Sequence, residues 1–197
     1  SSEQHKLQSG YNQRLGITLS MFTVEKFCYE RHILGITHMR LDPLSQQEVN
    51  RCSLRKDLGF TTSQVLLDFL IGSEEALVFK SLTNDTIYGI CGASSSILGG
   101  EIVVTPWFLS NGFHKEPDNI RAFLRVSKVL LQEWEQRCGY HRTFISSCVN
   151  DDRNVRLLEY LGFTWNRGIS EITFKKKGGR PYGIAVSYGS PEHGNNS

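Results

Sequence analysis

The sequence predicts a mixed α/β domain in which helices cover both faces of one central mixed sheet. Three short strand-forming segments, separated by turn residues, occupy residues 76–105. Apolar residues then recur at three- and four-residue steps over 117–138, which is the spacing of a long amphipathic helix. A strand-forming segment at 142–149 and a shorter helix that ends at Gly162 follow. Strands alternating with helices in this way are typical of a sheet packed between helical layers.

The N-terminal third is predicted to hold one strand and three helices. Residues 17–22 are rich in strand-forming types, and residues 24–34 are predicted to form a helix that Gly35 ends. An Asp-Pro pair starts the second helix, predicted over 43–56, because proline suits the first helical position. The third helix is predicted over 63–71, with its apolar residues on one face.

The strands in the middle of the chain are delimited by turn residues. Residues 76–80 and 86–92 are predicted strands joined by a hairpin-like turn. The serines and glycines of 94–100 predict a loop, and 101–105 predicts a third strand that Pro106 ends.

The ends of the chain differ in composition from its middle. We predict a polar N-terminal arm at 1–16, a folded domain at 17–175 and a C-terminal extension at 176–197. Within the C-terminal part, residues 163–165, 171–175 and 182–188 are strand-forming. No internal repeat divides the chain further.

Composition excludes several classes of protein. The chain has 197 residues and a net charge of +2, too small to indicate a nucleic-acid or membrane partner by itself. No apolar run reaches the roughly 18 residues of a transmembrane helix. The five cysteines are widely spaced, and neither they nor the histidines have metal-site spacing, so we predict a protein without a metal that is reduced and intracellular, or that is assembled inside a cell. They are Cys28, Cys52, Cys91, Cys138 and Cys148.

The order of elements from residue 101 to residue 163 resembles the acyl-CoA-dependent N-acetyltransferase-like (GNAT) fold. In that family the loop before the long helix reads Gln/Arg-x-x-Gly-x-Gly/Ala, and it holds the pyrophosphate of the coenzyme on backbone N–H groups. The corresponding segment here, 106–118, has a single glycine, Gly112, and places Glu116 and Asp118 where they would repel an anion. This departure from the family's loop predicts that no coenzyme is bound.

If acetyl-CoA were bound nonetheless, the resemblance places it on backbone groups of one strand and on the loop. The residues concerned would be Val103, Val104, Thr105 and Gly112. This is the alternative reading, a working N-acetyltransferase.

The family's closing helix reads Asn-x-x-Ala-x-x-Phe-Tyr-x-x-x-Gly-Phe, and its tyrosine protonates the departing thiolate. Counting back from Gly162, that position holds Leu158, which has no proton to donate. Tyr160 lies two residues further on, about 200° around the helix, so it does not replace the missing acid. No catalytic residue is predicted.

A second resemblance is to the internal virion protein A family of short-tailed phages (podoviruses), similar to a degenerate GNAT fold. It covers residues 17–175 and rests on short motifs: Met39-Arg40-x-Asp42, Glu48-Val49, Trp107-Phe108-Leu109, Arg121-x-Phe123-Leu124-Arg125-x-Ser127, the loop at Asn150, Arg156-Leu157-Leu158 and Leu161-Gly162-Phe163. It implies a non-catalytic structural protein of the virion that acts in assembly or DNA ejection. Its partners would be other virion proteins in a multi-copy assembly, and it would reside in the virion, and in the host cytoplasm during assembly.

Two groups of basic residues are candidates for interaction. Arg121 and Arg125 lie one turn apart on the long helix and are suited to phosphate or to an acidic partner, but the favoured interpretation is a solvated face on which they pair with Glu116 or Asp118. The strongest basic cluster comprises Lys175, Lys176, Lys177 and Arg180. It is either a solvated turn or a contact to packaged DNA through phosphates, and the latter makes a DNA-contacting virion protein the third reading.

Three further residues have a structural and a functional interpretation. Arg40 and Asp42 are interpreted as a structural ion pair that fixes the first helices. Trp107 is either an interface anchor or a core residue at the end of a strand, and the core is favoured.

Overall fold

The computed structural model describes residues 22–50, 57–98, 100–138, 143–144, 148–149, 152–163, 167–168, 171–173, 184–185 and 187–188. The chain divides into two compact units, Ser1–Ser94 with Trp107–Tyr140 and Ser95–Pro106 with His141–Ser197. The arm at 1–16 and most of the extension at 176–197 lie outside the described residues, so those predicted boundaries stay predictions. None of the described helices is long and apolar enough to cross a membrane.

The main sheet has five strands in the order β1-β2-β3-β4-β5. They are β1 (Phe22–Lys26), β2 (Glu75–Ser81), β3 (Ile87–Leu98), β4 (Glu101–Ser110) and β5 (Thr143–Phe144). β2 is antiparallel to both β1 and β3, whereas β4 and β5 run parallel. A sheet with both kinds of pairing is the predicted central mixed sheet.

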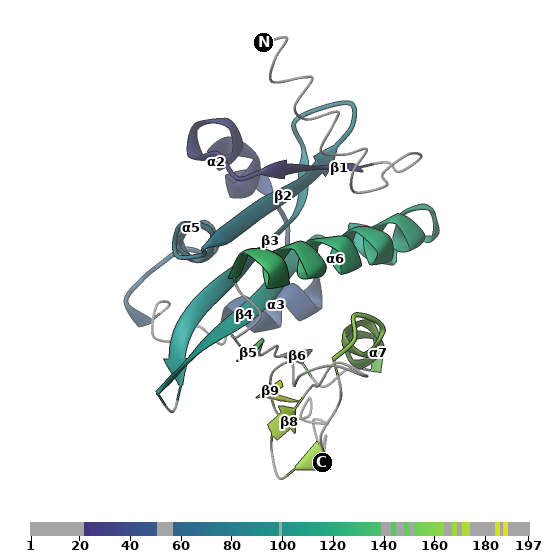
Figure 1. Ribbon diagram of the computed structural model, residues 1–197. Helices are drawn as coiled ribbons and strands as arrows, with labels where there is room; N and C mark the ends of the chain where they lie inside the picture. The colour runs from purple at the N-terminus through teal and green to yellow at the C-terminus, as the bar shows by residue number, and fades with distance from the viewer. Residues whose placement is uncertain are drawn as a thin grey trace, which may run out of the picture. The chain divides into compact units, whose positions relative to one another are not determined.

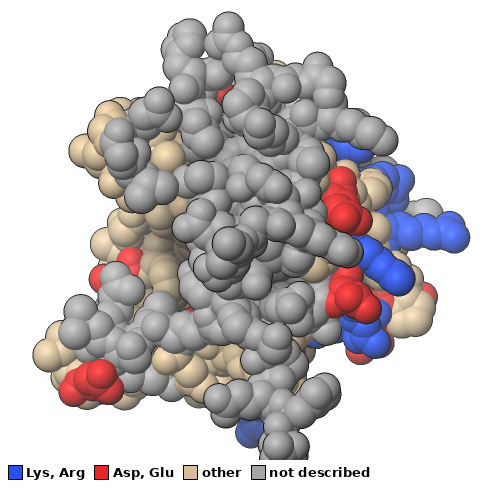
Figure 2. All heavy atoms as spheres, turned by 90° about the horizontal axis from the view of Figure 1, so that it is seen from below, with Lys and Arg blue, Asp and Glu red and all other residues tan. Residues whose placement is uncertain are grey.

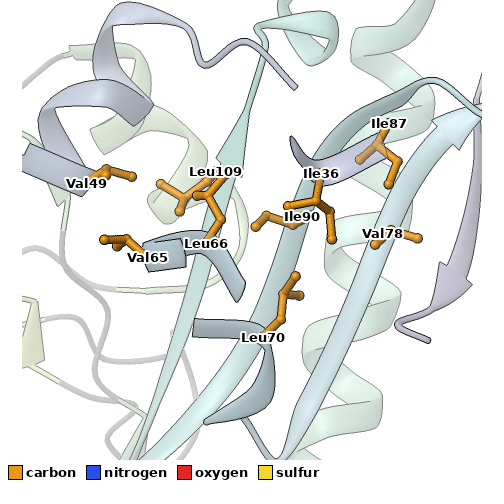
Figure 3. Packing of buried hydrophobic residues seen from close by; sticks show 9 residues of the cluster. All are labelled: Ile36, Val49, Val65, Leu66, Leu70, Val78, Ile87, Ile90 and Leu109. Atoms are coloured by element: carbon orange, nitrogen blue, oxygen red, sulfur yellow. The ribbon is translucent and has the colours of Figure 1, made fainter. Parts of the chain in front are cut away.

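Three helices cover one face of this sheet: α2 (Tyr29–His38), α3 (Pro43–Asn50) and α5 (Thr62–Ile71). α5 begins with a capping box, because the Thr61 hydroxyl accepts from the Gln64 N–H and the Gln64 side chain accepts from the Thr61 N–H. The helices and strands share a buried apolar cluster, whose members point toward one another in Figure 3. It comprises Ile36, Val49, Val65, Leu66, Leu70, Val78, Ile87, Ile90 and Leu109.

The opposite face is covered by α6 (Pro117–Cys138), which crosses in front of β3 and β4 in Figure 1. Alternate strand residues point to opposite faces, so Phe79 and Phe108 turn away from the first cluster and toward α6. Their ring centroids lie 5.9 and 4.9 Å from that of Phe123 on α6. Helices therefore lie on both faces of the sheet within the first unit, as predicted.

The second unit holds the described elements of the C-terminal part. α7 (Asp152–Tyr160) follows β6 (Cys148–Val149), which pairs in parallel with β10 (Ser187–Tyr188). A separate antiparallel sheet contains β7 (Arg167–Gly168), β8 (Glu171–Thr173) and β9 (Ile184–Ala185). The predicted helix before Gly162 and the predicted strands near 171 and 184 are thus present, although the strands are shorter than expected.

The boundary between the first strand and the first helix was predicted wrongly. Residues predicted to start a helix at Val24 instead pair with β2 as part of β1, and α2 begins five residues later. Gly35 lies inside α2 rather than ending it. A Cβ at Gly35 would lie 2.8 Å from Cδ1 of Ile87, so the glycine allows close packing of helix against strand.

The predicted loop at 94–100 and the predicted end of the third strand at Pro106 were also wrong. β3 continues through the serines to Leu98, and β4 continues through Pro106 to Ser110. Among the described residues β5 pairs only with Val103 and Val104. Pro106 lies beyond this described pairing, and a proline is tolerated in a strand where its missing N–H is not needed by a neighbouring strand.

Candidate functional site

The segment between β4 and α6 is where the resemblance places a coenzyme phosphate. It consists of a turn at Asn111 and Gly112, a single 3-10 turn, η1 (Phe113–Lys115), and Glu116. Gly112 has φ of +92°, a left-handed conformation that favours glycine. The one glycine of this loop therefore serves the turn itself.

The backbone N–H groups of this segment are almost all used within the protein. The acceptors are Tyr88 O for Asn111, Ser110 Oγ for Gly112, Asn111 Oδ1 for Phe113, Gly112 O for Lys115, Phe113 O for Glu116, and Glu116 O for both Asn119 and Ile120. Pro117 has no N–H to offer. From 111 to 120, only the N–H groups of His114 and Asp118 have no described acceptor. A phosphate needs several convergent donors, and this loop does not present them.

The ammonium group of Lys115 is also engaged. Its Nζ lies 2.9 Å from Oδ2 of Asp42, whose side chain is 8% exposed, and Oδ1 of Asp42 accepts the Ser45 N–H at 2.8 Å. Burial raises the pKa of Asp42, but the hydrogen bonds from Ser45 and Lys115 outweigh burial and hold that pKa below its ordinary value. Asp42 is therefore ionised, and it neutralises the loop's cation.

Asp42 has a different partner from the one predicted. The sequence suggested Arg40 as its partner, but Arg40 is exposed and the described carboxylate pairs with Lys115, 73 residues away. Ser45 strengthens the same junction, because its hydroxyl accepts the Ser110 N–H at 2.9 Å, and the Asp42 N–H donates to Ser110 O at 2.8 Å. The start of α3 is thus fastened to the end of β4.

Aromatic side chains fill the space beneath the loop. Phe113 is 6% exposed, and its ring centroid lies 5.2 Å from that of Phe22 and 5.4 Å from that of Phe79. His114 packs 4.8 Å from Phe123, and its Nδ1 lies 3.1 Å from the Ser110 hydroxyl. Burial, together with the charge of Lys115, lowers the pKa of His114 to about 4. His114 is accordingly neutral at pH 7 and is part of the core.

These residues do not fit a coenzyme pyrophosphate. All but two of the N–H groups donate within the protein, Lys115 is neutralised, and the exposed carboxylates of Glu116 and Asp118 stand at the start of α6. Carboxylates there are favoured by the helix dipole and repel a second anion at the same place. The segment behaves as a structural junction.

The residues proposed to hold a thioester and a phosphate fall in different units of the chain. Val103, Val104 and Thr105 belong to the second unit and Gly112 to the first. Val103 and Val104 are buried and pair with β5, so that edge of their backbone is used by the sheet.

Leu158 and Tyr160 both lie in α7. Leu158 is 8% exposed, as an apolar helix residue that faces a core would be. Tyr160 is 43% exposed and lies on a different side of the helix. The proton-donor position is therefore occupied by a packing residue.

The structure describes one of the two groups of basic residues but not the other. Arg121 and Arg125 are exposed on α6, and neither pairs with Glu116 or Asp118, contrary to the pairing suggested above. Lys175, Lys176, Lys177 and Arg180 lie outside the described residues. On the described part of the face in Figure 2, Lys and Arg atoms lie beside Asp and Glu atoms, not in a field of one sign.

Trp107 is a core residue and not an interface anchor. It is partly buried against Phe69, at a centroid distance of 5.5 Å, and its Nε1–H donates to the Ser73 hydroxyl at 2.8 Å. The favoured interpretation of Trp107 as a core residue is confirmed, although Trp107 lies within β4 and not at its end.

Sequence reasoning missed a buried polar network beside β1. The Cys28 N–H donates to Nδ1 of His32 at 2.9 Å, so Nε2 carries the proton and donates to Glu25 at 2.9 Å. Lys80 Nζ lies 3.4 Å from the other carboxylate oxygen of Glu25. Burial lowers the pKa of His32, which keeps the ring neutral. No sequence signal joins these positions, because the helix and two strands bring them together.

No described group of three or more His, Cys, Asp or Glu side chains is arranged to hold a metal ion. No protein-family model matches the sequence, and no curated protein matches it.

Several solved structures are similar to this chain. Glucosamine-6-phosphate N-acetyltransferase from Arabidopsis thaliana is 11% identical, with 75% of this chain and 94% of that chain covered and a TM-score of 0.46. A GNAT-family acetyltransferase from Bacillus anthracis is 12% identical, with 77% and 84% covered and a TM-score of 0.46. Ribosomal-protein-S5-alanine acetyltransferase from Vibrio fischeri is 10% identical, with 85% and 91% covered and a TM-score of 0.45.

Sequence identities this low do not establish an activity for this chain. The fold is assigned from the chain's own order of elements and strand pairing. The order of elements is the one expected from the sequence: a strand, helices, an antiparallel run of strands, a long helix and then a strand parallel to β4. The chain has a GNAT-like mixed α/β fold.

Proposed function

We propose that this chain is a non-catalytic GNAT-like protein that acts through protein–protein contacts as a component of the virion of a short-tailed phage, or in its assembly. The virion assignment is supported by the sequence resemblance to the internal virion protein A family, which is an analogy. The loss of catalysis is supported by the loop between β4 and α6.

The single observation that carries the non-catalytic reading is the internal use of that loop. Its N–H groups donate within the protein, and Lys115 is paired with Asp42. Binding a pyrophosphate there would require breaking several hydrogen bonds and bringing an anion next to Glu116 and Asp118. Leu158 at the proton-donor position removes the acid as well.

Acetyl-CoA is expected not to stabilise the protein. A ligand at ten times its Kd raises the free energy of unfolding by about 1.4 kcal/mol, which shifts Tm by about 3 °C in a chain of this size. We expect a shift below about 0.5 °C at about 1 mM acetyl-CoA in a thermal-denaturation series, because the loop does not offer the pyrophosphate a set of convergent free donors. A working N-acetyltransferase run in parallel is the positive control, and a saturable shift for this chain would refute the non-catalytic reading.

The virion role predicts that the protein is a stoichiometric part of particles or of assembly intermediates. Quantitative mass spectrometry of phage particles purified from cells that express the chain's phage genome should detect it at a fixed ratio to the major capsid protein. Absence from both particles and intermediates would rule out this role and leave the enzymatic reading untouched.

The alternative is an N-acetyltransferase that uses acetyl-CoA and holds the thioester on backbone groups of β4. The pairing of Val103 and Val104 with β5 occupies one edge of that backbone and does not favour this alternative. The third reading, contact with packaged DNA through Lys175–Lys177 and Arg180, stays a prediction and is tested by salt-dependent DNA binding of a variant with these residues replaced by alanine.

A further inference from the structure

The outer surface of the first half of α6 carries two neighbouring rows of side chains. Ile120 and Leu124 are one helical turn apart and form an apolar row, with Ile120 42% exposed and Leu124 partly buried. Arg121 and Arg125 form a parallel basic row, one residue further around the helix. α6 faces the viewer in Figure 1, and no described element of the first unit lies in front of it.

Neither arginine of the basic row is held in a described ion pair. Arg121 and Arg125 are exposed and make no described ion pair, although two like charges one turn apart destabilise a helix. The other end of the same helix is different. Arg137 binds Glu75 through Nε at 2.7 Å and Nη2 at 3.1 Å, and it lies 3.4 Å from Glu133. Arg137 thus ties α6 to the sheet through Glu75, whereas Arg121 and Arg125 make no described ion pair.

We propose that this α6 surface, defined by Ile120, Arg121, Leu124 and Arg125, binds an acidic amphipathic segment of another protein. Arginine beside exposed apolar area is the combination enriched at the centres of protein interfaces. Carboxylates one turn apart on a partner helix would reach Arg121 and Arg125, while its apolar row would cover Ile120 and Leu124. This inference rests on the proposed function, because it identifies the kind of partner contact that a scaffolding protein would use.

The charges around the surface favour protein over nucleic acid. Glu116 and Asp118, both exposed, precede the arginines on the same helix start, and Lys128 follows them one turn later. A phosphate backbone carries one sign throughout and would meet the two carboxylates unfavourably. A protein segment can carry charges of both signs and match this order.

The test uses the full chain and a synthetic fluorescent peptide, a helix with leucines one turn apart flanked by glutamates. We expect binding by fluorescence anisotropy with a Kd on the order of 10⁻⁵ M at about 0.05 M salt, weakening several-fold at about 0.3 M. The double change Arg121→Glu and Arg125→Glu should weaken binding at least about tenfold, and Ile120→Ala about threefold. Lys26→Glu, at an exposed position on β1, is the matched control for Arg121→Glu and should leave the Kd unchanged.

Three results would overturn the proposal. They are no peptide binding at about 1 mM, binding that the arginine changes leave intact, and tighter arginine-dependent binding of a random DNA duplex than of the peptide. A concentration-dependent dimer in sedimentation equilibrium that the double change abolishes would assign the surface to a second copy and also refute it. None of these depends on acetyl-CoA, so a failure here is distinct from a failure of the non-catalytic reading.

Discussion

Replacing Phe113 by alanine is expected to lower the free energy of unfolding by about 4 kcal/mol, one of the largest effects available in this chain. The side chain is 6% exposed and is surrounded by Phe22, Phe79 and Phe123, at centroid distances of 5.2, 5.4 and 5.9 Å. Alanine would leave a cavity among rigid rings that cannot collapse into it. Urea denaturation of wild type and variant measures the difference directly.

Phe60 provides the matched control for this change. It is 41% exposed, so the same substitution there removes few contacts and should cost less than about 1 kcal/mol. Equal losses at the two positions would mean that Phe113 is not part of the core. They would also remove the reason for describing the β4–α6 loop as a structural junction, because Phe113 belongs to that loop.

Acidification is expected to destabilise the protein through His114. The pKa of His114 is lowered from 6.5 to about 4 in the folded chain by burial and by Lys115. Between these values the unfolded chain binds the proton and the folded chain does not, so stability falls as pH falls from about 6.5 toward 4. The full difference corresponds to about 3 kcal/mol.

The measurement compares the wild type with His114→Gln, which keeps a polar side chain for Ser110 but does not titrate. Free energies of unfolding between pH 4 and pH 7 should fall more steeply for the wild type. His32, whose pKa is also lowered by burial, acts in the same direction and is present in both proteins, so it cancels in the comparison. Parallel curves would contradict the assignment of His114 to the core.

The sequence predicted those parts of the fold that local signals specify. Pro117 and the apolar spacing that follows it located α6, and Gly162 located the end of α7. Local signals failed where tertiary packing decided the conformation. Gly35 reads as a helix end but allows α2 to pack on Ile87, and Pro106 reads as a strand end but lies inside β4, beyond its described pairing with β5.

The candidate site divides in the same way. The shortage of glycines and the two acids before α6 are visible in the sequence, and they predict a poor phosphate loop. The reason the loop is closed was not visible, because it depends on Asp42 and Ser45, which the fold brings to Lys115 and Ser110 from far away along the chain. Whether the α6 arginines form ion pairs could not be predicted from the sequence either, because that depends on which carboxylates the fold places near them.

The junction between α3 and the loop has a consequence for how the chain folds. Asp42 and Lys115 are 73 residues apart, and Ser45 and Ser110 are 65 apart. Joining such distant segments costs loop-closure entropy that must be met before the contacts form. We expect these contacts to form after the folding transition state, so that Lys115→Met speeds unfolding and leaves the folding rate almost unchanged. The hydrogen-bonded loop between β4 and α6 would then slow the unfolding of the protein without changing how fast it folds.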